Sequence, residues 1–357
     1  MAVQIIAEAG VNHNGSLDIA RRLVDVAVEA GADIVKFQAF RADALVTRTA
    51  ARAAYQDRNM SAIGNQYEML KALELKARDF EVLQSYCDAQ GIGFLVTPFD
   101  LGSLDFLARD LGLKRFKIAS GDIVNAPLLL AVARCAEHVI VSSGMATLSD
   151  VQRALGILAF GFTCGEAAPT IKAFEEARSS VSGQNALRNR AAILHCTTDY
   201  PTADNDVNLR AMDTLHGQFG LCTGLSDHTD GWLIAAAAAA RGAEIIEKHF
   251  TLDRNMAGPD HRASLEPSDL RRMVAAIRQV ETALGTGEKL PTAAELKNIA
   301  AARASLVAAC SIRKGERFTE RNLTTKRPGT GIAPIHYWDW LGKPASRDYE
   351  QDELIDP

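Results

Sequence analysis

The chain has 357 residues, of which 47% are hydrophobic and 23% are charged. These proportions are ordinary for a folded globular protein, and they exclude a disordered chain, a collagen-like repeat and a coiled-coil rod. The 39 basic and 44 acidic residues leave a net charge of −5 and form no basic stripe, so we expect no nucleic-acid partner. The longest apolar run, residues 232–240, is too short to cross a bilayer, and we expect no membrane partner.

Cysteine usage and the N-terminal residues indicate the cellular compartment. Six cysteines are scattered through the chain with no CxxC pair, as expected for reduced thiols. The chain begins MAVQII and enters a strand-like run at once, without the basic region and cleavage site of a secretory signal. We therefore expect a soluble, cytoplasmic protein.

Short apolar runs alternate with helical patterns through most of the chain. Each run is apolar on both faces, which is typical of parallel strands covered by helices rather than of a sheet with one wet face. The eight predicted strands are residues 5–9, 34–40, 92–97, 116–120, 139–143, 193–197, 221–226 and 245–250.

The segments between these strands carry helix signals. Ser16, Ser103 and Ser149 each precede an amphipathic pattern and are predicted to be N-caps. A glycine in the left-handed conformation commonly ends a helix. The predicted helix stops are Gly31, Gly112 and Gly242.

Eight strand–helix units over about 285 residues predict a (β/α)8 barrel, an α/β fold. Two gaps between strands are longer than a minimal unit needs, so we place insertions at residues 46–67 and 162–190. The first is polar and irregular, and the second is expected to be a loop or helical excursion away from the barrel mouth. A doubly wound sheet is the alternative, but it normally stops at about five to seven strands.

The alternation of predicted strands and helices ends after the eighth predicted helix, residues 267–284. Residues 286–303 are interpreted as a linker with a short helix over 293–302, and residues 304–357 as a small β-rich domain. About fifty residues form only a marginal core by themselves, so we expect this domain to pack against a neighbouring domain or chain. The predicted organisation is thus a barrel over residues 1–285, a linker and a C-terminal cap.

Polar residues gather near the C-terminal ends of the predicted strands, where a (β/α)8 barrel has its active site. Residues two apart on a strand share a face, so Lys36 and Gln38 are expected to point into the barrel mouth while Phe37 packs outward. Glu247 and His249 share a face in the same way. Buried polar groups are costly unless satisfied, so packing alone does not explain the repeated pattern. The other polar residues at strand ends are Glu8, Thr97, Lys117, Ser120, Ser142, Ser143, His195, Thr197, Ser226, Asp227 and His228.

These residue types point to the chemistry of the site. Two lysines and several hydroxyls around one mouth suit an anionic substrate, such as one with a phosphate and a carboxylate. His228 and His249, on neighbouring strands, can jointly bind one divalent metal. Two protein ligands leave positions for water and substrate, as a Lewis-acid role requires. The residues therefore predict an enzyme for an anionic substrate.

Ten motifs follow one another across nearly the whole chain. They are IIAEAGVNHNGS (5–16), ADIVKFQAF (32–40), FLVTPFD (94–100), FKIASGDI (116–123), SSGMAT (142–147), LHCTTDYP (194–201), GLSDHT (224–229), IIEKHFTLDR (245–254), GPDH (258–261) and KRPGTGI (326–332). With these motifs in register, the sequence resembles the sialic acid synthase family, the phosphoenolpyruvate-dependent nonulosonate synthases. The resemblance implies a transferase built as a TIM barrel followed by a small antifreeze-like domain, the SAF domain.

The resemblance also implies roles for matching residues. His228 and His249 would hold a divalent metal, usually Mn²⁺, with Mg²⁺ or Co²⁺ as alternatives. Asp260 or Glu247 would transfer a proton, and the choice between them stays open. The residues that the resemblance implies bind phosphoenolpyruvate are Lys36, Thr97, Lys117, Ser120, Ser142 and Ser226.

The acceptor implied by the resemblance is an open-chain N-acyl mannosamine-type aldehyde, placed by Gln38, Tyr200 and Asp260. Arg327 would reach the N-acyl end of this sugar from the C-terminal domain, which in the family caps the partner's site in a domain-swapped homodimer. Two further substrate-binding positions, where some members carry other residues, are Asn14 and Thr198.

The first choice of function is N-acetylneuraminate synthase, which condenses phosphoenolpyruvate with N-acetylmannosamine and releases phosphate. The alternative is N,N'-diacetyllegionaminate synthase, whose acceptor is a 2,4-diacetamido-2,4,6-trideoxymannose that differs far from the reacting carbon. The condensing barrels of shikimate and lipopolysaccharide synthesis normally lack the C-terminal segment. The intact lysines, serines and histidines disfavour a non-catalytic sugar-binding barrel, and the charges at 313–317 disfavour an ice-binding cap.

Overall fold

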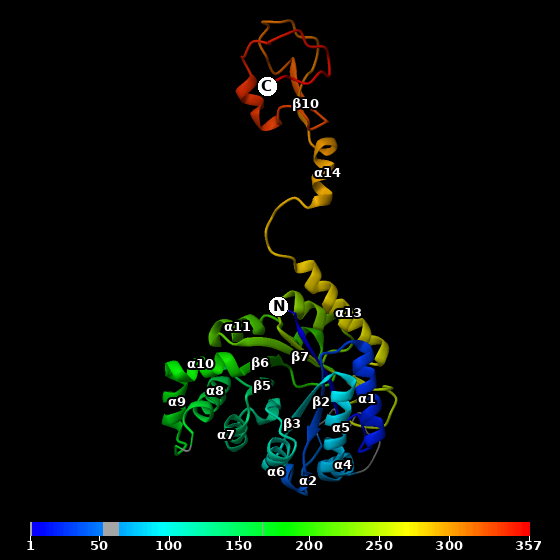
Figure 1. The fold of residues 1–357 in the computed structure, drawn as a ribbon, viewed down its shortest axis with the longest axis vertical. Coiled ribbons are helices and arrows are strands. Elements are labelled where there is room, and N and C mark those ends of the chain that lie inside the picture. The colour runs from blue at the N-terminus through cyan, green and yellow to red at the C-terminus, as the bar shows by residue number, and fades with distance from the viewer. Residues whose placement is uncertain (1, 53–63, 166) are drawn as a thin grey trace. The chain divides into compact units, whose positions relative to one another are not determined.

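The computed structural model describes residues 2–52, 64–165 and 167–357. The chain divides into two compact units, residues 1–285 and residues 286–357, and each is described by itself. In the first unit, strands form the centre and helices surround them (Figure 1).

The first unit is a closed barrel of eight parallel strands, in which each strand pairs with the next and β8 pairs with β1. This confirms the predicted (β/α)8 barrel and excludes the doubly wound sheet. The strands are β1 (Gln4–Gly10), β2 (Ile34–Ala39), β3 (Gly93–Pro98), β4 (Arg115–Ile118), β5 (His138–Ser142), β6 (Ala191–Cys196), β7 (Cys222–Asp227) and β8 (Ile245–His249).

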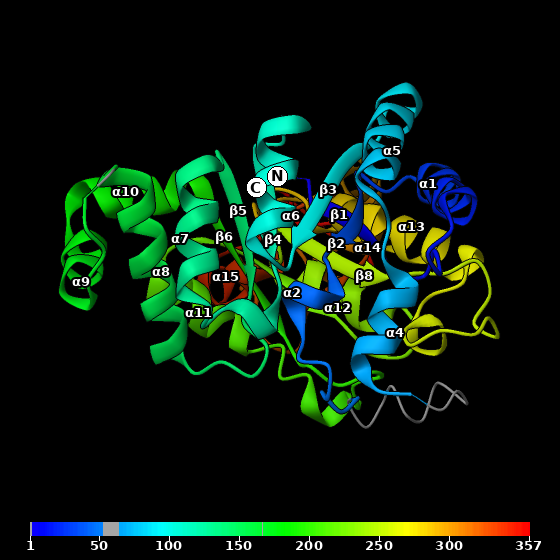
Figure 2. The same ribbon diagram turned by 90° about the horizontal axis from the view of Figure 1, so that it is seen from below.

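Helices cover the outside of the barrel, and Figure 2 shows α1, α5 and α13 together on one side of it. Within the described residues, no helix is long and apolar enough to span a membrane. The helices that follow the strands are α1 (Leu17–Ala30), α5 (Ala77–Gln90), α6 (Leu101–Asp105), α7 (Ala126–Cys135), α8 (Leu148–Thr163), α11 (Ala211–Phe219), α12 (Leu233–Ala240) and α13 (Pro267–Leu284).

Shorter elements lie in the loops. The predicted insertion at 46–67 falls partly on residues 53–63, which lie outside the described residues. The short elements are α2 (Ala42–Leu45), α4 (Gln66–Leu73), the π-turn η1 (Phe106–Asp110), and the 3₁₀ turns η2 (Ser120–Asp122), η3 (Asp204–Asp206) and η4 (His261–Ala263).

Several helix ends fall where the sequence predicts them. Ser16 caps α1, and its hydroxyl accepts a hydrogen bond from the Ile19 N–H at 3.4 Å. Gly31 ends this helix in the left-handed conformation, with φ of 78°. Gly112 and Gly242 also have positive φ, 70° and 97°, just beyond the ends of η1 and α12.

Two predicted helix starts are wrong. Ser103 lies inside α6, because Asp100 is the N-cap and its Oδ1 accepts from the Ser103 N–H at 2.8 Å. Ser149 lies inside α8, which Thr147 caps. Asp100 and Thr147 also cap helices well, and their position directly after the loop decides which residue takes the role.

The insertion at 162–190 is helical, as expected. α8 continues to Thr163, and α9 (Ile171–Ser179) and α10 (Val181–Arg190) pack against it, as Figure 2 shows. No residue of α9 or α10 is among those that line the cavity at the strand ends.

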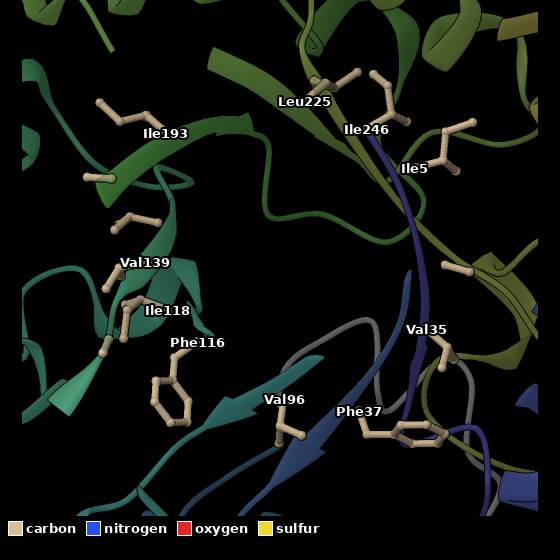
Figure 3. Close-up of a cluster of buried hydrophobic side chains, with 14 of the residues drawn as sticks. Ile5, Val35, Phe37, Val96, Phe116, Ile118, Val139, Ile193, Leu225 and Ile246 are labelled. Carbon is tan, nitrogen blue, oxygen red and sulfur yellow. The ribbon is translucent and has the colours of Figure 1, made fainter. Parts of the chain in front are cut away.

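Two apolar layers position the strands. Outward side chains form the main core between the strands and the helices, and Phe37 is fully buried there, as predicted (Figure 3). A second, inner layer fills the barrel beneath the C-terminal strand ends and forms a closed floor. Its buried members are Ile6, Ile34, Leu95, Ile140, Ala192, Leu194 and Ile245.

The second unit contains the helix α14 (Ala293–Ala302) and a small domain with its own core. The domain has an antiparallel pair, β9 (Ser305–Ala308) and β10 (Leu323–Lys326), the 3₁₀ turn η5 (Pro334–His336) and the short helix α15 (Tyr337–Trp340). Its buried core residues are Leu306, Ala308, Ile312, Phe318, Leu323, Ala345, Tyr349 and Ile355.

Gly224 in β7 stands where no side chain fits. A Cβ there would overlap the Ile245 carbonyl oxygen and approach Leu194 Cδ2 at 2.9 Å. We expect Gly224→Ala to lower the free energy of unfolding by about 1–3 kcal/mol, because overpacking displaces the backbone. The control is Gly217→Ala in α11, where a Cβ meets nothing within 4 Å and alanine favours the helix by about 1 kcal/mol. Urea unfolding measures both, and equal losses would contradict the packing argument.

Candidate active site

A cavity of about 430 Å³ lies among the C-terminal ends of the barrel strands. It brings together residues that are far apart in the sequence, from the end of β1 to the loop after β8. The expected site residues that line it are Lys36, Gln38, Thr97, Lys117, Ser120, Ser142, Thr198, Tyr200, Ser226, His228, Glu247, His249 and Asp260.

The two-residue period of a strand explains this convergence. Ile34 belongs to the inner apolar floor, and Lys36, two residues further along β2, lines the cavity. Ile245 and Glu247 have the same relation on β8. The same strands therefore supply a dry floor and, above it, the polar groups of the site.

Lys36 is held inside the barrel by three neighbours. It is 3% exposed, and its Nζ lies 2.7 Å from Glu8 Oε2 and 3.6 Å from Glu247 Oε2. It also donates a hydrogen bond to Thr97 Oγ1 at 3.2 Å. The ammonium thus has two carboxylate partners in place of its hydration shell.

Lys117 has a similar environment on β4. Its Nζ donates to Ser142 Oγ at 2.6 Å and lies 3.4 Å from Glu247 Oε1. The same oxygen of Glu247 accepts a hydrogen bond from Ser226 Oγ at 2.9 Å. Glu247 therefore links both lysines, and Glu8 adds a second carboxyl group beside Lys36, although burial raises the pKa of Glu8.

This network sets the protonation of its members. Burial opposes ionisation of Glu247, but Lys117 and Lys36 outweigh burial and lower its pKa to about 2. Burial also disfavours a charged Lys36, yet Glu247 and Glu8 outweigh it and raise the pKa of Lys36. Burial lowers the pKa of Lys117, and Glu247 offsets part of that effect. Lys36 and Glu247 are therefore charged at neutral pH.

His228 and His249 face one another across the ends of β7 and β8. Their ring centroids are 5.5 Å apart, and the Tyr200 ring lies 4.1 Å from that of His228. His228 Nδ1 hydrogen-bonds the Thr197 carbonyl oxygen at 2.7 Å, so this nitrogen carries the proton when the ring is neutral. Such a bond orients the other nitrogen, Nε2, as in many metal-binding histidines.

His249 has the properties of a second metal ligand. Its Nδ1 is buried and makes no hydrogen bond within the described residues, and Asp260 Oδ2 lies 3.9 Å away. Burial, with help from His228, keeps the pKa of His249 well below its usual value, so the ring is neutral and can donate a lone pair. Among the described residues no set of three or more His, Cys, Asp and Glu side chains is arranged to hold a metal. The unpaired Nδ1 of His249 and the oriented ring of His228 fit a cation with two imidazole ligands, which leaves positions for water and substrate.

Two expected site residues do not line the cavity. Asn14 has a φ of 50°, donates from Nδ2 to the Ala257 carbonyl at 2.8 Å, and pairs through Oδ1 with His261 Nε2 at 3.2 Å. Arg327 belongs to the second unit, where it is exposed. Its expected role in a partner's site stays a prediction.

Some polar residues at strand ends have structural partners instead. His195 Nε2 hydrogen-bonds the Val207 carbonyl at 2.6 Å, and Ser143 Oγ donates to the Leu194 carbonyl at 3.0 Å. Neither His195 nor Ser143 is among the cavity-lining residues. Buried backbone carbonyl groups need hydrogen-bond donors, and these two side chains supply them.

Glu8 has a larger part in the site than its place at a strand end predicts. Besides holding Lys36, its Oε1 accepts from Gln38 Nε2 at 2.9 Å. The available signal is its position two residues after Ile6, which marks an inward side chain. Apolar residues after β2 and β3 and on α4 also line the cavity, and in the sequence they cannot be told from ordinary core residues.

A buried ion pair lies behind the two histidines, on the outer face of β7 and β8. Lys248 Nζ is 2.7 Å from Asp227 Oδ2 and donates to the Thr229 carbonyl at 2.7 Å. Asp227 Oδ1 accepts from the Thr229 N–H and hydroxyl at 2.9 and 2.8 Å. Because His228 follows Asp227 and His249 follows Lys248, this pair fixes the strand ends that carry the histidines.

The fold and the site define a (β/α)8 enzyme with a buried, lysine-containing mouth. The chain belongs to the NeuB family, whose model matches residues 23–289, and residues 303–357 match the SAF domain. These matches confirm the family predicted from the motifs, and with it a synthase of the transferase class.

Three similar proteins bear on the choice between the two functions predicted from the sequence. The N,N'-diacetyllegionaminic acid synthase of Campylobacter jejuni is 45% identical over 351 residues, 98% of each chain. The enzyme of the same name from Legionella pneumophila is 44% identical over 342 residues, 96% of this chain and 90% of that one. The structure of an N-acetylneuraminic acid (sialic acid) synthetase from Leptospira borgpetersenii, in complex with citrate, has a TM-score of 0.66 and 33% identity, covering 84% of this chain and 90% of that one. The identities favour the alternative function over the first choice.

The ion pair between Asp227 and Lys248 gives a stability prediction. Lys248→Met should lower the free energy of unfolding by about 3–5 kcal/mol, because it leaves the Asp227 carboxylate buried without a counter-charge. The control is Arg109→Ala, whose partner Asp105 is exposed and whose loss should cost about 0–1 kcal/mol. Denaturant unfolding measures both, and a Lys248→Met protein as stable as the parent would refute the role of the pair.

Proposed function

We propose that the chain is an N,N'-diacetyllegionaminate synthase. It condenses phosphoenolpyruvate with the open-chain form of a 2,4-diacetamido-2,4,6-trideoxymannose and releases inorganic phosphate. The observation that carries this proposal is the 44–45% identity over nearly the full chain to two enzymes of that name. N-acetylneuraminate synthase, with N-acetylmannosamine as acceptor, is the second candidate, supported by the likeness to a sialic acid synthetase.

The lysine half of the cavity suits phosphoenolpyruvate. Lys36 and Lys117 supply positive charge for its phosphate and carboxylate, and Glu8 and Glu247 keep the lysines in place before the substrate binds. Holding the alkene in one orientation next to the aldehyde turns the condensation into a positioned reaction. The hydroxyl groups proposed to complete this shell are those of Thr97, Ser120, Ser142 and Ser226.

His228 and His249 are proposed to hold a divalent cation, with Mn²⁺ preferred to Mg²⁺ or Co²⁺. When bound there, such a cation polarises the acceptor's aldehyde oxygen and stabilises negative charge on it. The chain's own contribution is to present two oriented imidazoles, of which His249 is kept neutral by burial. The proposed places for the acceptor's hydroxyl groups are near Gln38, Tyr200 and Asp260, and Thr198 is proposed to lie near the phosphate of phosphoenolpyruvate.

The environments of two carboxylates separate the candidates for proton transfer. Glu247 forms ion pairs with two lysines and accepts a hydrogen bond from Ser226, and with a pKa of about 2 it is a weak base. Burial, with a contribution from Glu8, raises the pKa of Asp260 to about 6. A proton-transfer group works best when its pKa lies near the operating pH. Glu247 is engaged by both lysines, whereas Asp260 lines the cavity beside His249, with 3.9 Å between Oδ2 and Nδ1. We therefore propose proton transfer for Asp260 and the positioning of the lysines for Glu247.

A side-by-side assay of the two acceptors tests the function. Phosphate release from phosphoenolpyruvate should require a sugar and a divalent cation, and kcat/KM should be at least about tenfold higher for the diacetamido trideoxy sugar, in line with pocket discrimination between small substituents. Chelation of divalent cations should stop release. The control without sugar should release none. Higher kcat/KM for N-acetylmannosamine would reverse the order of the two candidates, and no release with either sugar would refute both.

The SAF domain is proposed to cap the active site of a partner chain in a domain-swapped homodimer, with Arg327 at the N-acyl end of the sugar. The small core of this domain supports the need for a neighbour. We expect His249→Ala and Arg327→Ala to be inactive separately. In a random mixture about half of the dimers are mixed and carry one intact site each, so about a quarter of the activity should return. A mixture that exchanges subunits yet stays inactive would show that the cap acts within one chain.

A further inference from the structure

The cavity at the strand ends is chemically divided. Its charged side chains come from the strand ends and the loops directly after them, whereas α2 and α4 add no charged side chain to the lining. Beyond the ends of β2 and β3, across the closed barrel from the end of β7 and His228, apolar side chains form a surface that we call the distal wall. Its residues are Phe40, Leu45, Val46, Met69, Leu70 and Phe99.

The distal wall is held in a defined shape. Phe40 and Met69 are each 6% exposed and belong to one apolar cluster, against which Leu45, Leu70 and Phe99 pack. The rings of Phe40 and Phe99 meet edge to face, with centroids 6.3 Å apart. A wall fixed in this way can select among ligands, because little side-chain freedom is lost on binding.

Polar contacts anchor the helix that carries part of the wall. A capping box joins Asn65 and Glu68 at the start of α4. On the exposed side, the Tyr67 hydroxyl donates to Asp43 Oδ1 at 2.8 Å, and Lys71 lies 3.3 Å from Asp43 Oδ2, so α4 is tied to α2. The polar groups of α4 thus face away from the cavity, except for Gln66, whereas Met69, Leu70 and Leu73 line it.

We propose that the distal wall is the subsite for the deoxygenated end of the acceptor sugar, with the C6 methyl group packed against Leu70 and Val46. This inference rests on the proposed function. The aldehyde carbon, C1, must lie at His228 and His249, and the open chain then carries C6 away from them, toward the apolar side. In N-acetylmannosamine, C6 carries a hydroxyl group, and this hydroxyl would meet apolar side chains there.

Simple energetics give the size of the expected selectivity. A methyl group gains from leaving water at an apolar wall, whereas a hydroxyl loses its water partners and is costly to bury unpaired. Apolar pockets discriminate such small differences by about tenfold to a hundredfold in kcat/KM. The charged groups serve both reactions and therefore give no preference between the two sugars. The distal wall accounts for such a preference.

The test places a polar group in the wall. Leu70→Gln should lower the ratio of kcat/KM for the diacetamido trideoxy sugar over N-acetylmannosamine by about tenfold or more. The KM for phosphoenolpyruvate should stay unchanged, because the proposed ligands of that substrate are lysines and hydroxyl groups that the substitution leaves in place. Leu70→Met, which keeps an apolar side chain of similar size, should retain the parent ratio.

Ala72→Gln is the matched control, because it adds the same side chain to an exposed position of α4. It should leave the ratio unchanged. If Leu70→Gln does not fold, Val46→Thr decides, since it adds one hydroxyl at nearly constant shape.

The outcomes separate the two proposals. A folded Leu70→Gln or Val46→Thr enzyme with the parent ratio would overturn the subsite while leaving the proposed function intact. No phosphate release by the unmodified enzyme with either sugar would overturn the proposed function and this inference with it.

Discussion

Lys36 and Lys117 carry the positive charge on which the proposed chemistry depends, and a buried ammonium is not stable by itself. Moving an ion out of water costs several kcal/mol in real proteins, and each of these lysines is only 3% exposed. Glu8 and Glu247 supply counter-charge at 2.7–3.6 Å. Ionised Glu247 is thus beside both lysines before a substrate arrives, and an entering anion competes with this carboxylate for the two ammonium groups.

This charge network in turn constrains the barrel. The network works only if water is kept out beneath it, and the apolar floor does this on the same strands. A one-residue shift in the register of β2 would replace Lys36 by Phe37 inside the barrel. On β8 the outward neighbour, Lys248, is itself buried and needs its own counter-ion, Asp227. Two separate buried charge networks, one inside and one outside, therefore fix the ends of the strands.

Features that depend on strand period could be predicted from the sequence: the eight strands, their closure, and the inward direction of Lys36 and His249. Features that depend on competition or on distance across the fold could not. Asp100 displaces Ser103 as a cap because both can cap and the end of the preceding loop decides between them. The pairing of Glu8 with Lys36 needs the separation of two side chains on neighbouring strands, which the sequence does not contain.

The motifs that identify the family lie mainly at strand ends. This position explains why the motifs do not determine which acceptor sugar is used. Condensation requires the same charged groups around the reacting carbons whichever nonulosonic acid is made, whereas the sugars differ at carbons remote from the reaction. Helix α4 lies outside all ten motifs. Selectivity has to come from parts of the cavity that the reaction does not constrain. Phe40 and Phe99 of the distal wall fall within motifs, but its other four residues lie outside them, border the same cavity and contribute no charge; they are Leu45, Val46, Met69 and Leu70.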